Sequence, residues 1–221
     1  MPRGERVVIV GAGIMGRAAA WQLALVGASV EVLERQPDPG RLAAGGSRAA
    51  SWTGSSHGAT RGLRYAYEDP AYARLAMHAE NWWRVAERLS GRELLRMTGG
   101  LDIGSPDATT FGRTLETVGA LGLEHELLDA AALRSRFPAF ELPPGTQALY
   151  QPGAGLIEAA DAMDAFAALA RDAGARFSFD SSVRRVVVDE AITLTVNRGG
   201  SAEELVCDRL VLAAGPWTED L

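Results

Sequence analysis

The sequence predicts an α/β protein in which strand–helix–strand units, typical of a parallel sheet, are separated by a stretch of helices and short strands. Three observations lead to this prediction. The first 35 residues run strand, glycine turn, helix, strand; the same order returns over residues 148–180; and the stretch between them alternates helices with short strands. Such alternation is typical of layered α/β folds. With 221 residues, 47% of them hydrophobic, the chain can bury a sizeable core.

The first strand and its glycine turn carry the most specific signal in the chain. Arg6 to Val10 is a short β-branched run that predicts a buried strand. Gly11, Gly13 and Gly16 follow as G-x-G-x-x-G. In this motif the first glycine permits a tight turn, the second lets the backbone approach a pyrophosphate, and the third lets a helix pack on the strand. The turn therefore predicts a Rossmann-like nucleotide site at the start of the next helix.

The helix and the second strand complete this unit. Apolar spacing predicts the helix from about Ile14 to Val26, ended by Gly27. The second strand, "SVEVLE", ends in Glu34, where a carboxylate can accept hydrogen bonds from an adenosine ribose. Glu34 disfavours a 2′-phosphate on that ribose by repulsion, although the neighbouring Arg35 weakens this inference. From these residues alone, NAD and FAD are both open.

The remaining elements follow from composition and periodicity. Residues 35–54, rich in Gly, Pro, Ser and Ala, predict a loop. The predicted elements after it are helices at 71–89, 108–123 and 129–137, a strand–turn–strand at 94–104, a strand–loop–helix–strand unit at 148–180 whose helix ends at Gly174, and short strands from 181 with a turn at Gly199 and Gly200.

The last predicted strand, Leu210–Ala214, ends in Gly215. Taken alone, this stretch indicates no more than another strand with a glycine turn. As the last strand of a sheet that begins with "VVIVGAG", it would bring a second stretch of backbone to the same nucleotide.

Composition excludes several classes of partner. The formal net charge is −6, and all 22 basic residues are arginine, with no basic run or face. This argues against nucleic acid and against an anionic membrane surface as partners. A single cysteine, Cys207, excludes internal disulfides and a cysteine-built metal site, so no metal is expected. The absence of a signal peptide or a long apolar stretch predicts a cytoplasmic protein.

The stretch "GSSHGATRGLRYAY", residues 54–67, gathers a histidine, a threonine and two arginines in a glycine-punctuated loop. The simpler interpretation is that Arg61 and Arg64 are ordinary surface arginines and that His57 packs in the loop without a chemical role. The alternative is a loop that faces a ligand.

Six stretches, in this order, resemble the FAD-dependent amine and amino-acid oxidase (DAO) family, in particular its monomeric sarcosine oxidase and N-methyltryptophan oxidase group: "VGAGIMG", "SSHGATRGLRYAY", "TGGLDIG", "QPGAGLI", "SSVRRV" and "LAAGPW". The resemblance implies FAD as the cofactor and a FAD-binding Rossmann-like sheet of the glutathione-reductase type, with a partial antiparallel α+β substrate domain. It also implies oxidation of the C–N bond of a small N-alkyl amino acid, with oxygen reduced to hydrogen peroxide.

The resemblance also assigns roles to residues. Arg61 would lie over the flavin ring and stabilise its anionic reduced form, and Arg64 would pair with the substrate carboxylate. His57 would lie near the flavin edge, and Thr60 beside the ring. The residues implied to bind the cofactor are Gly11, Gly13, Ile14, Met15, Gly16, Glu34, Arg35, Gly54, Ser55, Arg61, Gly62, Val183 (through its backbone, to the adenine), Ala214, Gly215 and Trp217.

By the same resemblance, residues 1–70 form a first FAD-binding segment, 71–150 a partial substrate domain, and 151–221 a second FAD-binding segment. Members of the family are longer, and their second half carries a lysine thought to activate oxygen, a cysteine that bonds the flavin and a closing glycine-rich segment. The expected partners are therefore a small amino-acid or amine substrate and a complementary C-terminal half. Two alternatives are a flavin dehydrogenase that uses another electron acceptor and a non-catalytic nucleotide-binding fragment or subunit.

Overall fold

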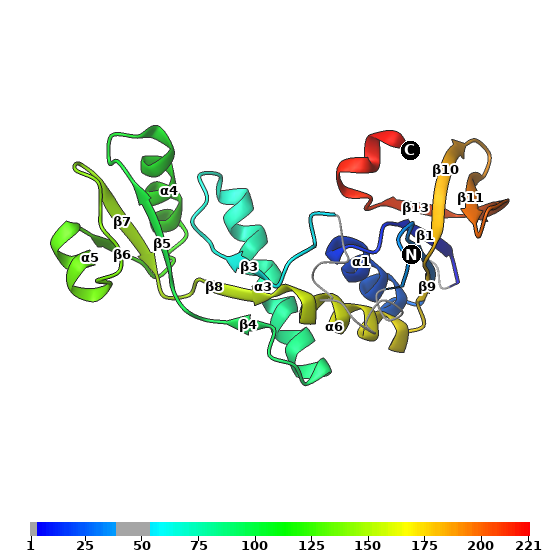
Figure 1. Cartoon of the computed structure of the whole chain (residues 1–221), viewed down its shortest axis with the longest axis horizontal. Coiled ribbons are helices and arrows are strands. Elements are labelled where there is room, and N and C mark those ends of the chain that lie inside the picture. The colour runs from blue at the N-terminus through cyan, green and yellow to red at the C-terminus, as the bar shows by residue number, and fades with distance from the viewer. Residues whose placement is uncertain (1–3, 39–53) are drawn as a thin grey trace. The chain divides into compact units, whose positions relative to one another are not determined.

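The computed structural model describes residues 4–38 and 54–221 (Figure 1). Most of the predicted loop at 35–54 lies outside these residues. The chain divides into two compact units: unit 1 comprises Met1–Ala59, Leu89–Arg92 and Ala159–Leu221, and unit 2 comprises Thr60–Arg88 and Glu93–Glu158. Residues 60–70 and 151–158, which the predicted boundaries place with the nucleotide-binding segments, belong to unit 2, because strands from these two stretches pair with each other.

Unit 1 is built on a four-stranded parallel sheet with the order β13-β1-β2-β9. The strands are β1 (Arg6–Val10), β2 (Ser29–Leu33), β9 (Arg176–Ser178) and β13 (Arg209–Leu212). Three consecutive residues of β1, Val7, Val8 and Ile9, are fully buried. A central strand of a parallel sheet is covered on both faces, so it reads as a continuous apolar run rather than as an alternating one. The predicted strand at residues 6–10 and the predicted α/β class are confirmed.

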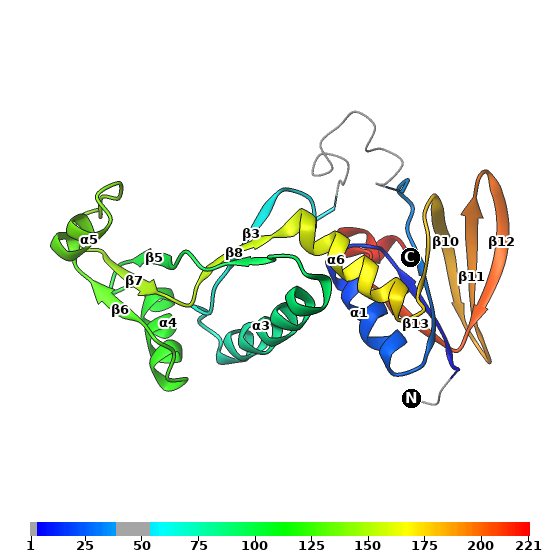
Figure 2. The same ribbon diagram turned by 90° about the horizontal axis from the view of Figure 1, so that it is seen from below.

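Two layers cover this sheet (Figure 2). One face carries the helices α1 (Ile14–Leu25) and α6 (Ala159–Asp172), which pack against each other. Their alanine-rich faces allow close approach, and the rings of Trp21 and Phe166 meet edge to face at 5.5 Å. The other face carries a three-stranded antiparallel sheet of β10 (Ser181–Val188), β11 (Ile192–Arg198) and β12 (Ser201–Cys207).

The core between the two sheets of unit 1 follows from the alternation of side chains along a strand. Val8 and Val10 of β1 point to the same face and pack with Leu194, Val196 and Leu205 of the antiparallel sheet. The predicted turn at Gly199 and Gly200 joins β11 to β12, and both glycines have positive φ, as a two-residue hairpin turn requires.

Unit 2 contains two small antiparallel sheets and helices. One sheet has the order β3-β8-β4, with β3 (Thr60–Leu63), β8 (Gly155–Glu158) and β4 (Leu95–Arg96). The other has the order β5-β7-β6, with β5 (Gly100–Gly104), β7 (Gln147–Gln151) and β6 (Glu126–Leu128). The helices are α4 (Thr109–Ala120), α5 (Ala130–Arg136) and α3 (Pro70–Ser90), the last of which ends beyond the unit boundary.

The two sheets of unit 2 are joined by two neighbouring connections, β4 to β5 and β7 to β8. The backbone N–H of Gly99 donates to the carbonyl of Ala154 at 2.9 Å, and a Cβ on Gly155 would overlap the carbonyl oxygen of Arg96. A Cβ on Gly100 would likewise lie only 2.8 Å from that of Ala154, so glycine is needed at positions 100 and 155, where these two connections touch. Among the described helices, none has the length and apolar character needed to cross a bilayer.

Candidate functional site

The three glycines of the G-x-G-x-x-G turn have three different surroundings. Gly11 has a φ of +104°, and a Cβ there would overlap the carbonyl oxygen of Ala213, which follows β13. A Cβ on Gly16 would overlap the carbonyl oxygen of Gly11. A Cβ on Gly13 would meet only one side chain, that of Ser56, with its hydroxyl oxygen 3.1 Å away. Gly11 and Gly16 therefore serve close packing, whereas the lack of a side chain at Gly13 lets Ser56 approach the helix terminus.

Glu34 lies just beyond the carboxyl end of β2 and is 9% exposed. Its Oε2 accepts a hydrogen bond from the backbone N–H of Ala12 at 2.8 Å, and its Oε1 accepts one from the N–H of Gln36 at 2.9 Å. Each carboxylate oxygen has two lone pairs, so both oxygens can still accept from ribose hydroxyls. The contact with Ala12 fixes the carboxylate against the glycine turn, which suits a dinucleotide that touches both.

An arginine and a tryptophan stack beside this turn. The guanidinium of Arg35 lies 4.0 Å from the ring centroid of Trp217, a cation–π contact. Trp217 belongs to the 3₁₀ helix η2 (Gly215–Asp220), which follows β13. A Cβ on Gly54 would lie 3.5 Å from its ring. Three segments far apart in sequence thus meet at the carboxyl ends of β2 and β13, the edge at which open α/β sheets bind their ligands.

Ser56 is a residue that the sequence interpretation did not select. Its Oγ accepts a hydrogen bond from the backbone N–H of Ile14, the first residue of α1, at 3.0 Å. The neighbouring Ser55, which was selected, is exposed. His57 closes the turn, because its backbone N–H and its Nδ1 both contact the carbonyl oxygen of Gly54, at 3.1 and 2.5 Å. No local pattern distinguishes two adjacent serines, so only the fold shows which one meets the helix.

Four other predicted cofactor residues also lie in unit 1. Ala214 and Gly215 follow β13, which ends at Leu212, so the predicted strand to Ala214 is two residues too long. Val183 is buried in the core between the sheets. The side chain of Met15, in the first turn of α1, is 73% exposed.

Arg17 is a second residue that the sequence interpretation missed. It is 2% exposed, its Nε donates to the carbonyl oxygen of Ala12 at 2.7 Å, and its Nη1 donates to that of Met163 at 2.6 Å. Burial lowers the pKa of its guanidinium to about 10. Glu34 and Arg17 thus hold the N–H and the C=O of the same Ala12 residue. A lone arginine before the run "AAA" of α1 was the available signal, because it interrupts an apolar helix face.

The second half of the 54–67 loop belongs to unit 2. Thr60, Arg61 and Gly62 lie on β3 and are exposed, and Nη1 of Arg61 donates to the carbonyl oxygen of Thr60 at 2.8 Å. The structure thus gathers Gly54, Ser56 and His57 with the glycine turn in unit 1. It assigns Thr60, Arg61, Gly62 and Arg64 to unit 2.

Arg64 already has a carboxylate partner in unit 2. Its Nη1 lies 3.6 Å from Oδ1 of Asp102 on β5, and its guanidinium lies 5.1 Å from the ring centroid of Tyr67. Burial raises the pKa of Asp102, and the positive charge of Arg64 opposes that shift. The arrangement shows that a carboxylate can approach Arg64, and Asp102 is a third residue that the sequence interpretation did not select.

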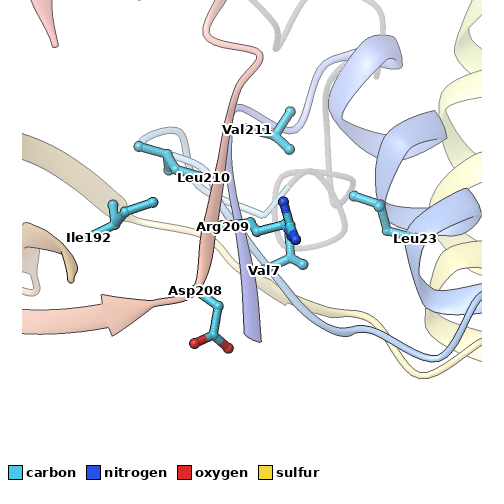
Figure 3. A pocket seen from close by; sticks show the side chains of 7 residues that line it. All are labelled: Val7, Leu23, Ile192, Asp208, Arg209, Leu210 and Val211. Atoms are coloured by element: carbon cyan, nitrogen blue, oxygen red, sulfur yellow. The ribbon is translucent and has the colours of Figure 1, made fainter. Parts of the chain in front are cut away.

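A pocket of about 330 Å³ lies elsewhere in unit 1 (Figure 3). It is lined by Val7, Leu23, Ile192, Asp208, Arg209, Leu210 and Val211. Val7 and Asp208 to Val211 mark the amino-terminal part of β1 and β13, away from the glycine turn at the carboxyl ends. Its two charged residues have partners: Arg209 pairs with Glu5, and Asp208 accepts from the backbone N–H of Arg6. This pocket is therefore not the nucleotide site.

The remaining groups of chemical interest are Cys207 and possible metal ligands. Cys207 is 4% exposed and belongs to the core between the two sheets of unit 1, where burial raises the pKa of its thiol. A buried cysteine in apolar surroundings is a packing residue. Within residues 4–38 and 54–221, no three His, Cys, Asp or Glu side chains are grouped so that they could hold a metal ion.

Comparison with known proteins places these observations in context. A family profile described as "DAO: FAD dependent oxidoreductase" matches residues 6–221. The monomeric sarcosine oxidase of Streptomyces avermitilis is 33% identical over 217 residues, which are 97% of this chain and 53% of that protein. The N-methyl-L-tryptophan oxidase of Salmonella arizonae is 26% identical over 97% of this chain and 54% of that protein.

A solved structure agrees with the sequence comparisons. The open form of NikD, described as an unusual amino acid oxidase essential for nikkomycin biosynthesis, has a TM-score of 0.81 and 30% identity. The match covers 100% of this chain and 53% of that one. The chain thus spans about half the length of the curated relatives and of this structural neighbour.

Proposed function

The chain belongs to the DAO family of FAD-dependent oxidoreductases, and from this premise we propose that it is the FAD-binding portion of an enzyme that oxidises the C–N bond of a small N-alkyl amino acid. The names of its relatives, sarcosine oxidase and N-methyl-L-tryptophan oxidase, support this substrate class. The observation that carries the proposal is the assembly around Gly13 and Glu34, where the amino terminus of α1, with Ser56 at its first N–H, and a fixed carboxylate lie at the carboxyl edge of a parallel sheet.

FAD is the cofactor of this family, and unit 1 fits it. When bound, FAD supplies the acceptor for the hydride that leaves the carbon attached to the amine. The glycine turn would hold the pyrophosphate with Ile14 and Met15, and Glu34 would accept from the ribose. The further cofactor residues of unit 1 would be Gly11, Gly16, Arg35, Gly54, Ser55, Val183, Ala214, Gly215 and Trp217, and those of unit 2 would be Arg61 and Gly62. We propose a glutathione-reductase-type arrangement for unit 1.

The substrate would be held by residues of unit 2. Arg64 would pair with the substrate carboxylate, because a planar guanidinium offers two parallel N–H donors. Its side chain is 55% exposed, so N–H groups other than the one that faces Asp102 are accessible to a substrate carboxylate. Arg61 would provide positive charge beside the electron-accepting ring, next to Thr60 on the same strand. His57, of unit 1, would contribute at the flavin edge. The imine product would hydrolyse in water, and oxygen would take up the electrons to give hydrogen peroxide.

A spectroscopic experiment tests the proposal in two stages. The first stage is titration of the purified chain with FAD, monitored by the flavin fluorescence and by the visible absorption band. The second is anaerobic addition of sarcosine, with and without the second half of a relative, and then of oxygen with a peroxide assay. Uptake of FAD and bleaching by sarcosine are expected. A chain that takes up no FAD would contradict the proposal, and bleaching without peroxide would favour a dehydrogenase with another acceptor.

Substitutions distinguish the substrate residue from a general effect of charge. Arg64→Gln is expected to raise the sarcosine concentration needed for half-maximal bleaching at least tenfold, because it removes the charge that pairs with the carboxylate. Arg113→Gln, at an exposed position of α4, is the matched control and should leave that concentration unchanged. Equal behaviour of the two variants would remove Arg64 from the substrate site.

A further inference from the structure

The hydroxyl of Ser56 occupies a well-defined place at the amino end of α1. Its Oγ lies 3.0 Å from the backbone nitrogen of Ile14 and accepts that N–H. The first N–H groups of a helix have no partner within the helix, and they attract anions. A Cβ on Gly13 would lie 3.1 Å from the same oxygen, which is tighter than an ordinary contact. The second glycine of the motif therefore allows this serine, as well as a ligand, to approach.

The turn that carries Ser56 is anchored on both sides. Within the turn, the backbone N–H of His57 donates to the carbonyl oxygen of Gly54 at 3.1 Å. On the outside, the ring of Trp217 lies against Gly54, and the guanidinium of Arg35 stacks on that ring. Ser56 is thus presented to the helix terminus by a turn that two other segments of unit 1 support.

The chemistry of a hydroxyl decides what Ser56 can do at this place. It accepts the Ile14 N–H through a lone pair, so its own proton remains available for donation. A pyrophosphate oxygen at the glycine turn is the strongest acceptor that the cofactor of this family offers, and hydrogen bonds to charged oxygens are about twice as strong as neutral ones. Accepting the Ile14 N–H makes the Ser56 hydroxyl a stronger donor, because chained hydrogen bonds polarise one another. The hydroxyl would then attract an anion, as the helix terminus does.

We propose that Ser56 binds the pyrophosphate of FAD: its Oγ accepts from Ile14 and donates its proton to a phosphate oxygen. It thereby links the turn at residues 54–57 to the G-x-G-x-x-G turn through a single side chain. The turn is already anchored by its own contacts, so the cofactor would meet a hydroxyl that is held in place before binding. The proposal rests on the use of FAD and does not depend on which amine the enzyme oxidises.

Calorimetric titration with three ligands tests this proposal on the whole chain. Adenosine, ADP and FAD are titrated into the wild-type chain, Ser56→Ala, Ser56→Thr and Ser201→Ala, the last a control at an exposed serine of unit 1. Ser56→Ala is expected to weaken ADP and FAD binding about tenfold, the size expected for one charge-assisted hydrogen bond, and to leave adenosine binding unchanged. Ser56→Thr keeps the hydroxyl and should stay within about threefold of wild type.

Several outcomes would overturn the proposal. Unchanged or tighter ADP binding by Ser56→Ala would mean that the hydroxyl competes with the phosphate for the Ile14 N–H. An equal loss for adenosine, or an equal loss in the threonine variant, would mean that the turn has changed shape. Far-ultraviolet circular dichroism of each variant guards against misfolding. Failure of the wild-type chain to bind FAD would contradict the proposed function as well, whereas a negative result for Ser56→Ala alone would leave that function intact.

Discussion

Replacing Gly16 by alanine tests whether the glycine turn is set by packing as the structure indicates. The new Cβ would overlap the carbonyl oxygen of Gly11 and would lie 3.5 Å from Cγ2 of Ile9. The obstructing atom belongs to the backbone between β1 and α1, so no side chain can rotate away. Overpacking of a core costs about 1–3 kcal/mol, and overlap with a backbone atom puts this substitution at the upper end, about 2–3 kcal/mol. Because alanine gains about 1 kcal/mol over glycine in a helix, a net loss of roughly 1–2 kcal/mol in the free energy of unfolding is expected.

Gly119 provides the matched control. It also lies inside a helix, α4, and a Cβ there would meet nothing within 4 Å. The same substitution, Gly119→Ala, should therefore raise the free energy of unfolding by roughly 0.5–1 kcal/mol through helix propensity alone. The two variants differ in one respect, the presence of a backbone oxygen opposite the new methyl group.

The assay is urea unfolding monitored by circular dichroism. Hydrogen exchange of peptides from each unit then shows where protection of the backbone amides changes. Gly16→Ala should lose protection in β1 and α1 and should weaken FAD binding, since the Gly11 carbonyl must move. Gly119→Ala should gain protection in α4 only. The packing argument would be refuted if Gly16→Ala were as stable as wild type, or if both variants were destabilised equally.

Three further outcomes are expected in unit 2. Glu87→Ala should lower the free energy of unfolding by about 2–3 kcal/mol in urea titrations, because its carboxylate accepts from the N–H groups of Leu94 and Leu95 at 2.8 and 2.9 Å. Burial raises the pKa of the Glu87 carboxyl, but these hydrogen bonds and a neighbouring arginine outweigh burial and hold the pKa below 4.5. The stabilisation is therefore present above pH 4.5 and is lost as the pH falls through the pKa of the folded state. Glu87→Gln should flatten this part of the curve of stability against pH. Burial raises the pKa of Asp102 above 3.8, so Asp102→Asn should stabilise the fold at pH 7, and the gain should vanish once the pH falls below 3.8; destabilisation at pH 7 would mean that its ion pair outweighs burial.

The sequence was sufficient for the parts of the fold that depend on local pattern. β1 begins and ends at the predicted residues, and α1 ends within one residue of the prediction. The predicted helix at 71–89 is observed at 70–90. Each of these elements has its own periodicity and its own stop signal, so neighbouring residues carry the information.

The contacts of the candidate site could not be predicted in the same way. Ser56 lies 42 positions from Ile14, and Asp102 lies 38 positions from Arg64. Pairs of this kind depend on how strands and loops come together, and neither partner has a distinctive neighbourhood in the sequence. The unit boundary inside the 54–67 loop was missed for the same reason: β3 pairs with β8, almost a hundred residues later.

The order of the strands in unit 1 has a consequence for synthesis. β1 pairs with β2, 23 residues onward, but its other neighbour, β13, begins about 200 residues later. Closing the longer loop costs about 2 kcal/mol more in chain entropy than closing the shorter one. All of unit 2 is encoded between these two strands.

A ribosome therefore releases every residue of unit 2 before the parallel sheet can be completed by β9 and β13. Until Arg209–Leu212 emerge, the apolar edge of β1 has no partner on that side, and the turn at Gly11 lacks the carbonyl of Ala213 that it packs against. Exposed strand edges of this kind attract other chains. The nascent chain would therefore need protection throughout the synthesis of unit 2, and the packed glycine turn that the cofactor needs would not exist before β13 emerges.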